Sequence, residues 1–254
     1  MTDSAKPLAG KVAIVIGAGQ NIGRGIALAL AADGARVVVN GRSNQGAVDE
    51  VVAAIEGGGG EALAVLGDVS REEDVARLVA ATVERFGGVD IAVSNAGLRR
   101  QTPFTEMSFA EWKEILSVAL DGAFLLARAT VPLMIERGGG RFIGMSGVSH
   151  HVGTTERAHV NASKAGLEGL VRGLARELAP QNITANCVAP GAIDTVRGAA
   201  AGASPSAGAM AGIPLNRKGR IDEIAETVRF LVGPHGGYIT GQTVHVNGGM
   251  FLAK

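Results

Sequence analysis

The sequence contains few of the residues that would mark it as a disulfide-rich, secreted or strongly aromatic protein. Its 254 residues include one cysteine, one tyrosine and one tryptophan, and aromatic side chains make up only 4% of the chain. A single cysteine cannot form a disulfide within the chain, which is compatible with a reducing compartment. Because Cys187 stands in an apolar stretch, we expect a buried thiol there.

Charge of one sign and long apolar runs are also lacking. The 24 lysines and arginines balance the 24 aspartates and glutamates, so no basic surface for nucleic acid or anionic lipid is expected. No apolar run reaches about 18 residues before a charge or a glycine cluster interrupts it, and residues 1–10 have no apolar core of signal-peptide length. We therefore expect a cytoplasmic protein with no membrane or nucleic-acid partner.

Short β-branched segments alternate with longer segments of helical period. Seven segments are predicted as strands, at residues 12–16, 36–40, 62–66, 91–94, 141–145, 183–188 and 243–246. Six are predicted as helices, at residues 22–32, 47–55, 72–86, 109–136, 159–178 and 222–231, with capping boxes at Ser70/Glu73 and Ser108/Glu111. The alternation predicts an α/β fold with one Rossmann-like, doubly wound, parallel seven-stranded sheet.

One domain is expected over residues 10–254, after an N-terminal tail at residues 1–9. The Gly/Ala/Ser-rich stretch at residues 198–212 has neither period nor charge, so it is predicted to be a long loop. Loops of this kind are often mobile lids, and we expect one over about residues 196–215, with ordinary disorder as the alternative. Its larger apolar residues, Met210 and Ile213, would permit a small apolar substrate.

A glycine-rich turn follows the first predicted strand directly and opens the first predicted helix. It contains Gly17, Gly19, Asn21, Ile22 and Gly23. Glycines leave the backbone N–H groups bare, and a helix N-terminus favours negative charge, so this turn suits the pyrophosphate of a dinucleotide.

The end of the second predicted strand indicates which dinucleotide binds. An acidic residue there would hold the ribose 2′-hydroxyl of NAD(H), whereas an arginine would accept the 2′-phosphate of NADP(H). The chain has Arg42 at this position and no acid before Asp49, so NADP(H) is preferred and NAD(H) remains an alternative. Asp68, after the third predicted strand, is either an acceptor near the adenine or a turn residue.

From Gly10 to about Gly249 the chain resembles the short-chain dehydrogenase/reductase family. The matching motifs are the glycine turn, Gly67-Asp68-Val69, Ser94-Asn95-Ala96-Gly97, Ala162-Ser163-Lys164-Ala165-Gly166, the segment Asn186–Thr195, and Tyr238-Ile239-Thr240-Gly241-Gln242 leading to Asn247-Gly248-Gly249. The resemblance implies a nicotinamide cofactor across the carboxyl edge of the sheet, and a homo-oligomer, commonly a tetramer, that uses the C-terminal strand. It also implies further cofactor-binding residues: Asp68, Val69, Asn95, Ala96, Gly97, Lys164, Pro190, Gly191, Ile193 and Thr195.

The catalytic positions depart from the family pattern, which is an Asn, a Ser, and a Tyr four residues before a Lys. Only Lys164 is plainly present; Ala119, Gly147 and Val160 stand at the other positions, although Ser146 could be the displaced Ser. Valine has no proton to give, so ketone reduction through a tyrosine is not expected. The 2,4-dienoyl-CoA reductases look like family members that lack the tyrosine and keep the lysine.

In the glycine turn, Ile16 and Asn21 replace the usual Thr and Gly, and Asn tolerates positive φ.

The segment from Ser146 to His159 contains groups that could replace the missing acid. His150 and His151 are the first candidates, beside Lys164 and Ser146, because imidazole has a pKa of about 6.5 and this loop leaves the ligand-binding edge of the sheet. No metal is expected, since no third ligand is identifiable beside the two histidines. The sequence thus predicts an NADP(H)-dependent oxidoreductase with a non-standard proton donor, acting on a carbonyl, an alcohol or an activated alkene. The alternatives are a non-catalytic NADP(H)-binding protein, or a lyase or isomerase that uses the histidine loop.

Overall fold

A computed structural model of the chain describes residues 6–196 and 212–252. Seven parallel strands form one sheet in the order β3-β2-β1-β4-β5-β6-β7. The strands are β1 (Val12–Ile16), β2 (Arg36–Gly41), β3 (Ala62–Leu66), β4 (Ile91–Ser94), β5 (Gly140–Met145), β6 (Ile183–Pro190) and β7 (Thr243–Val246). The predicted sheet and all seven strands are confirmed, with ends displaced by two residues at most.

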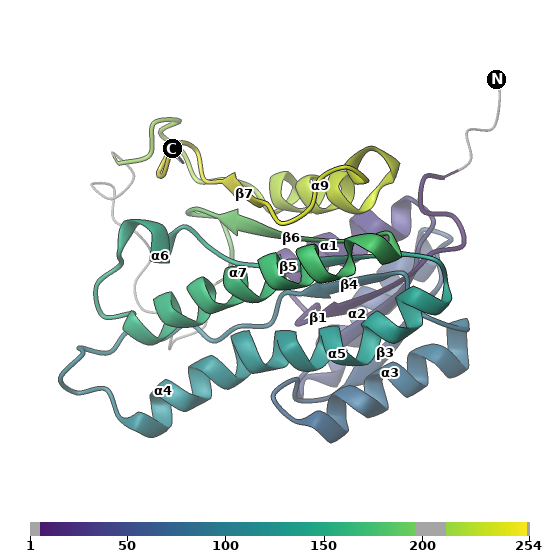
Figure 1. Cartoon of the computed structure of the whole chain (residues 1–254), viewed down its shortest axis with the longest axis horizontal. Coiled ribbons are helices and arrows are strands. Elements are labelled where there is room, and N and C mark those ends of the chain that lie inside the picture. Colours follow the sequence, from purple (N-terminus) through teal and green to yellow (C-terminus); the bar gives the residue numbers. More distant parts are fainter. Residues whose placement is uncertain (1–5, 197–211, 253–254) are drawn as a thin grey trace.

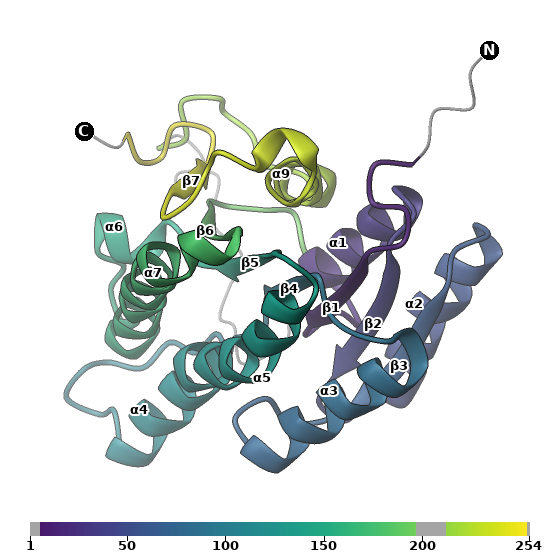
Figure 2. The same cartoon turned by 45° about the vertical axis from the view of Figure 1, so that its right-hand side comes forward.

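Helices cover both faces of the sheet (Figures 1 and 2). Those with described bounds are α1 (Asn21–Ala32), α2 (Gln45–Gly57), α3 (Glu72–Phe86), α4 (Phe109–Leu116), α5 (Gly122–Glu136), α6 (Ser149–Val152), α7 (Ala158–Leu178) and α9 (Ile221–Val232). Figure 2 shows α1, α2 and α9 on one face and α3, α4, α5 and α7 on the other. Each crossover therefore returns the chain to the same edge of the sheet, as parallel strands require.

The core consists of two apolar layers, one on each face of the sheet. β1 is buried along its whole length, and its side chains alternate between the layers. Ala13 and Val15 pack with α1, α2 and α9, whereas Ile14 and Ile16 pack with α3, α5 and α7. Burial on both faces explains why the strands read as continuous apolar runs in the sequence.

Two local predictions about helices were wrong. The single helix predicted over residues 109–136 is interrupted by a π-helical turn, η1 (Ser117–Asp121), which separates α4 from α5. The capping box predicted at Ser70/Glu73 does not form, because the Ser70 hydroxyl donates to Asp68 instead and α3 begins after Arg71. At the other box, Ser108 does accept a hydrogen bond from the Glu111 N–H, at 3.1 Å.

The apolar stretch Phe109–Glu136 meets the length and hydropathy expected of a membrane-spanning helix, although Asp121 and Arg128 interrupt it. In the structure 44% of its most apolar window is buried, and α5 packs against α3 and the sheet. A core helix meets the same criteria, so this stretch alone carries little weight for a membrane location.

Other sequence predictions concern the N-terminus, the lid and the cysteine. Leu8, within the predicted tail, is buried and joins the core. The predicted lid falls largely on residues 197–211, which lie outside the described part of the chain. Cys187 is buried as expected, and burial raises the pKa of its thiol to about 12, so the thiol is not a nucleophile at neutral pH.

Candidate functional site

A groove runs along the carboxyl edge of the sheet, at the point where the strand order reverses between β1 and β4. Two adjoining cavities of about 420 and 460 Å³ form it, and they share lining residues that include Ile22, Asn95 and Gly97. We call the first the loop cavity, because the turn after β1 lines it, and the second the lysine cavity, because Lys164 lines it. Ligands of open α/β sheets bind at such a reversal.

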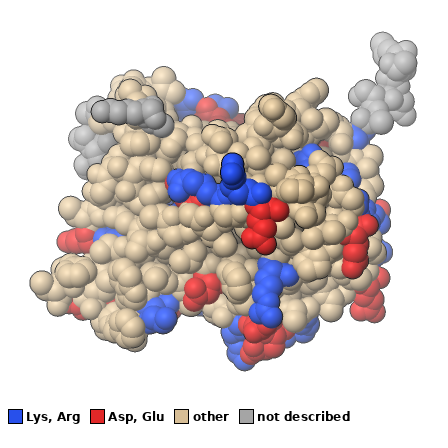
Figure 3. Space-filling view, in the orientation of Figure 1, with Lys and Arg blue, Asp and Glu red and all other residues tan. Residues whose placement is uncertain are grey.

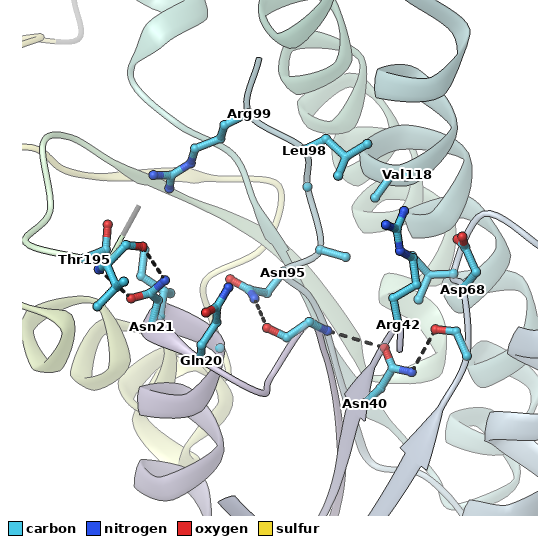
Figure 4. Close-up of a pocket in the computed structure, with 18 residues that line it drawn as sticks. Gln20, Asn21, Asn40, Arg42, Asp68, Asn95, Leu98, Arg99, Val118 and Thr195 are labelled. Carbon is cyan, nitrogen blue, oxygen red and sulfur yellow. Dashed lines mark hydrogen bonds between the residues drawn. The ribbon is translucent and has the colours of Figure 1, made fainter. Parts of the chain in front are cut away.

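The turn after β1 is held in a very tight conformation. Gly17 has φ +65°, and a Cβ atom there would lie 3.1 Å from Ala96 Cα. A Cβ atom at Gly23 would lie 2.2 Å from the Gly17 carbonyl oxygen. The Asn95 side chain donates to that same oxygen at 2.9 Å and so joins the end of β4 to the turn (Figure 4). Only glycine fits at residues 17 and 23. The N–H groups of Gly17 and Ala18 donate to Asn40, so the backbone donors that remain for a ligand are those at the start of α1.

Asn21 adopts the positive φ, +50°, that the sequence analysis expected it to tolerate. Its side chain, however, does not bond the local backbone. Its amide donates to the Val196 carbonyl and its oxygen accepts from the Val196 N–H, both at 2.9 Å (Figure 4). This reciprocal pair ties the turn to the segment after β6 and closes one side of the loop cavity, a contact that a glycine at residue 21 could not make.

The far end of the loop cavity contains Arg42 and Asp68 (Figure 4). Asn40 is buried at the end of β2, and its amide donates to the Val65 and Gly67 carbonyls, which fixes the ends of β2 and β3 relative to each other. Arg42 is exposed beside it, and the residues of β2 offer no carboxylate. Asp68 accepts from Ser70 and so has the predicted turn role, while it also lines the cavity.

Lys164 lies on α7, one helical turn after Val160, and both side chains line the lysine cavity. Its Nζ donates to the Met145 carbonyl at 2.6 Å, and a Cβ atom at Gly97 would lie 3.4 Å from that nitrogen. Burial, helped by the nearby positive charge of Arg99, lowers the pKa of Lys164 to about 8. Lys164 can therefore gain or lose a proton near neutral pH.

The structure also places the three other positions of the catalytic pattern. Ala119 is buried in the π-helical turn, a feature that is frequent at functional sites. Gly147 lines the lysine cavity, and a Cβ atom there would have no neighbour closer than the Pro190 oxygen at 4.0 Å. Val160 contributes only methyl groups. None of the three residues supplies a polar side-chain group, and free space for a side chain is present at Gly147.

Of the candidate acids, Ser146 shares the lysine cavity with Lys164, whereas His150 and His151 do not line it. Ser146 lines the lysine cavity, but its hydroxyl donates to the buried carboxylate of Glu168 at 2.7 Å. His150 and His151 also lie against Glu168, and neither is among the described residues that line the lysine cavity. The short helix α6, where the sequence analysis predicted a loop, directs both imidazoles to the α7 side.

Most of the predicted cofactor-binding residues do line the groove. The loop cavity is lined by Gly17, Asn21, Ile22, Gly23, Arg42, Asp68, Val69, Asn95, Ala96, Gly97 and Thr195, and the lysine cavity adds Lys164, Pro190, Gly191 and Ile193. Gly19 is the exception, because its Cβ position faces Ala47 of α2 at 3.3 Å.

Two arginines also line the lysine cavity: Arg157, which belongs to the segment from Ser146 to His159, and Arg99, which was not among the predicted site residues. A signal was present, since Arg99 follows the Ser94–Gly97 motif by two residues. Their charges make this cavity more polar than the predicted apolar site. Ile213, from the predicted lid, is buried near Gly248 instead of in this cavity.

Comparison with known proteins agrees with this geometry. A family model described as enoyl-(acyl carrier protein) reductase matches residues 17–251. A 3-oxoacyl-(acyl-carrier-protein) reductase of Synechocystis is 40% identical over 246 residues, which cover 96% of this chain and 98% of that protein. The corresponding reductase of Vibrio cholerae is 38% identical over 245 residues, with 96% and 99% covered.

A solved structure gives the same result. A short-chain type dehydrogenase/reductase from Mycobacterium marinum superimposes with a TM-score of 0.90 at 32% identity, with 98% of each chain covered. The groove and the exposed Arg42 at its far end fit the predicted cofactor, NADP(H). The chain belongs to the short-chain dehydrogenase/reductase family of oxidoreductases.

Proposed function

We propose that this chain is an NADP(H)-dependent reductase of a carbonyl or activated-alkene group and that Lys164 is its proton source. One observation carries the proposal. Among the described residues that line the lysine cavity, Lys164 is the only side chain with a pKa brought near neutral pH, at about 8. The cavity arginines stay protonated at all accessible pH values, and the Ser146 hydroxyl is engaged by Glu168.

The residues of the loop cavity fit the cofactor. The N-terminus of α1 would take the pyrophosphate, and the guanidinium of Arg42 would pair with the 2′-phosphate. Asp68 and Val69 would lie beside the adenine. Asn95 to Gly97, and Pro190 to Thr195, would flank the nicotinamide half.

Replacing Arg42 by alanine tests the cofactor preference. Loss of a charge-assisted hydrogen-bond pair worth about 1.5–3 kcal/mol should weaken NADPH binding roughly 10- to 100-fold. NADH binding should change much less, because NADH has no 2′-phosphate. Fluorescence titration with both cofactors measures this, and Arg176→Ala, an exposed arginine on α7, is the matched control. Equal losses for NADPH and NADH would contradict the assignment.

Proton transfer would then fall to Lys164. Bound NADPH would supply a hydride to the electrophilic carbon of the substrate. The Lys164 ammonium would give its proton to the carbonyl oxygen, or to the carbon next to the activating group of an alkene. The neutral amine left behind regains a proton from solvent. Its hydrogen bond to the Met145 carbonyl orients the amine toward the cavity in either state.

The pH dependence of turnover follows from the lowered pKa of Lys164. Reduction needs the ammonium form, so kcat/KM should be level below a pH of about 8 and fall tenfold per unit above it. Lys164→Arg should lower the rate by about 10²–10⁴, since arginine does not release its proton. The fall of kcat/KM at high pH should also disappear in this variant. Lys113→Arg, at an exposed position on α4, is the control.

NADPH oxidation with 2-enoyl and 3-oxoacyl thioesters measures this profile. Both acceptors are chosen from the relatives, which are described as reductases of enoyl and 3-oxoacyl chains carried on acyl carrier protein. If kcat/KM does not fall above a pH of about 8, Lys164 is not the acid. Tight NADPH binding without oxidation by either acceptor would instead support the non-catalytic alternative.

The altered positions favour an alkene over a ketone as the reducible group. Ketone reduction places negative charge on an oxygen that Val160 and Gly147 cannot stabilise, because neither carries a hydrogen-bond donor in its side chain. When a conjugated alkene accepts a hydride, the negative charge is spread over several atoms, so less stabilisation is needed at any one of them. Proton transfer from Lys164 is then sufficient to complete the reduction.

The Val160→Tyr replacement tests whether the cavity is still organised around hydride transfer. A phenol at this position would stand one helical turn before Lys164, and a positioned acid contributes about 10²–10⁴ in rate. We expect ketone reduction to increase at least tenfold, and further with Gly147→Ser, since space for a side chain exists there. Val160→Phe is the matched control without a hydroxyl. An equal gain in Val160→Phe, or no gain in either Val160→Tyr or the Val160→Tyr/Gly147→Ser double variant, would contradict the proposal.

We also propose that the chain forms a homo-oligomer. Phe109, Phe124 and Ile135 on α4 and α5 are 77%, 48% and 45% exposed, and charged side chains are sparse over this face (Figure 3). β7 is an edge strand, which agrees with the interface that the family resemblance implies. Apolar surface of this kind marks an interaction site, and a second copy of the chain explains it without a membrane.

Light scattering coupled to gel filtration tests the oligomer. The wild-type mass should be a multiple of 25.7 kDa, a tetramer or a dimer. Phe124→Glu should shift it to a smaller species because a charge would be buried in the interface. Val83→Glu, on the exposed side of α3, should leave the mass unchanged. A monomeric wild type would contradict the proposal.

A further inference from the structure

We propose that His150, His151 and Glu168 form a binding site for a divalent transition metal of the zinc class. This site lies between α6 and α7, beside the C-terminal strand β7, and outside the lysine cavity. The proposal concerns residues that the reductase chemistry above does not use, and it stands whether or not that chemistry is correct. The sequence offered two neighbouring imidazoles and no third ligand; the fold supplies the third from α7.

The ligand atoms converge on one point. Nε2 of His150 and Nε2 of His151 lie 3.2 and 3.0 Å from the same carboxylate oxygen, Oε1 of Glu168. One nitrogen or oxygen from each residue lies within 4.8 Å of the others. Ligands about 2.0–2.2 Å from a tetrahedral zinc ion lie a little over 3 Å apart. The separations therefore already approach those of a filled site.

Burial and hydrogen bonding distinguish this cluster from a surface group of histidines. The side chains of His150, His151 and Glu168 are 8%, 17% and 2% exposed. In the described part of the chain, both ring nitrogens of His150 are buried without a hydrogen-bond partner. Buried imidazole nitrogens that lack partners cost free energy, and a metal ion would satisfy the one that faces the carboxylate.

Hydrogen bonds to Glu168 alone do not account for the arrangement. Oε1 already accepts from Ser146 at 2.7 Å and lies within hydrogen-bond distance of His151, whereas the short contact with His150 lacks the geometry of a hydrogen bond. Two imidazoles and a carboxylate are ligands that Zn²⁺ binds well.

Outer partners hold the ligands in place. Arg172 donates to Glu168 Oε2 at 3.1 Å, which leaves Oε1 directed at the imidazoles. His151 stacks on Phe251 with ring centroids 4.7 Å apart, and His245 lies edge-on to His151 at 4.6 Å. Metal ligands are commonly oriented by such contacts. Three protein ligands would leave a fourth position for water.

A bound ion would join three parts of the chain that are distant in sequence. It would hold α6 to α7, and through His151 it would fix the ring contacts with β7 and the C-terminal segment. Because an ion that binds only the folded state stabilises it by mass action, Zn²⁺ should raise the melting temperature. This readout does not depend on catalysis.

Zinc titration of the untagged full-length protein, after dialysis against EDTA, tests the site. Calorimetry should give one Zn²⁺ per chain, and Co²⁺ in its place should give a visible absorption band of a site with nitrogen and oxygen ligands. His150→Ala and His151→Ala should each weaken Zn²⁺ binding at least about 100-fold, more than the 10- to 100-fold typical of losing an outer partner. Glu168→Gln should do the same.

His235→Ala is the matched control, because His235 is exposed and distant from the site in the sequence. It should bind Zn²⁺ as the wild type does. If Glu168→Gln fails to fold by circular dichroism, the two histidine variants still decide the question. No stoichiometric uptake of Zn²⁺ by the wild type, or uptake that both histidine variants retain, would overturn the proposal.

Discussion

The close packing of backbone at the end of β1 is the constraint on which the groove depends. Gly17 and Gly23 approach so closely that a Cβ atom at Gly23 would overlap the Gly17 carbonyl oxygen. The amide of Asn95 holds that oxygen and so fixes β4 against β1 at the reversal of strand order. This packing determines where α1 begins, which way the turn after β1 faces and where the two cavities meet.

Cofactor binding and chemistry are separable in this groove. The loop cavity is built from backbone geometry and from Asn40, Arg42 and Asn95, none of which belongs to the altered catalytic positions. Val160 and Gly147 change only the lysine cavity. The chain can therefore keep the family's cofactor site while the proposed reaction rests on Lys164, whose pKa is already lowered by burial beside Arg99.

The sequence predicted the sheet and most of the groove, because buried strands and the glycine turn are set by local pattern. It could not predict features that depend on which distant segments meet. The π-helical turn around Ala119 has no signal in helical periodicity, and the pairing of Asn21 with Val196 joins residues 175 positions apart. Glu168 was overlooked for the same reason, since its position on α7 reads as an ordinary helical glutamate.

A crystal structure of the chain with bound NADPH would decide how the groove holds the cofactor. The 2′-phosphate should lie within hydrogen-bond distance of Arg42, the pyrophosphate on the turn after β1, and the nicotinamide at the junction of the two cavities. Lys164 Nζ should then be the nearest proton-bearing side chain to the substrate space, within about 3 Å of a bound acceptor. A nicotinamide outside this junction, or His150 or His151 at that distance instead, would contradict this arrangement.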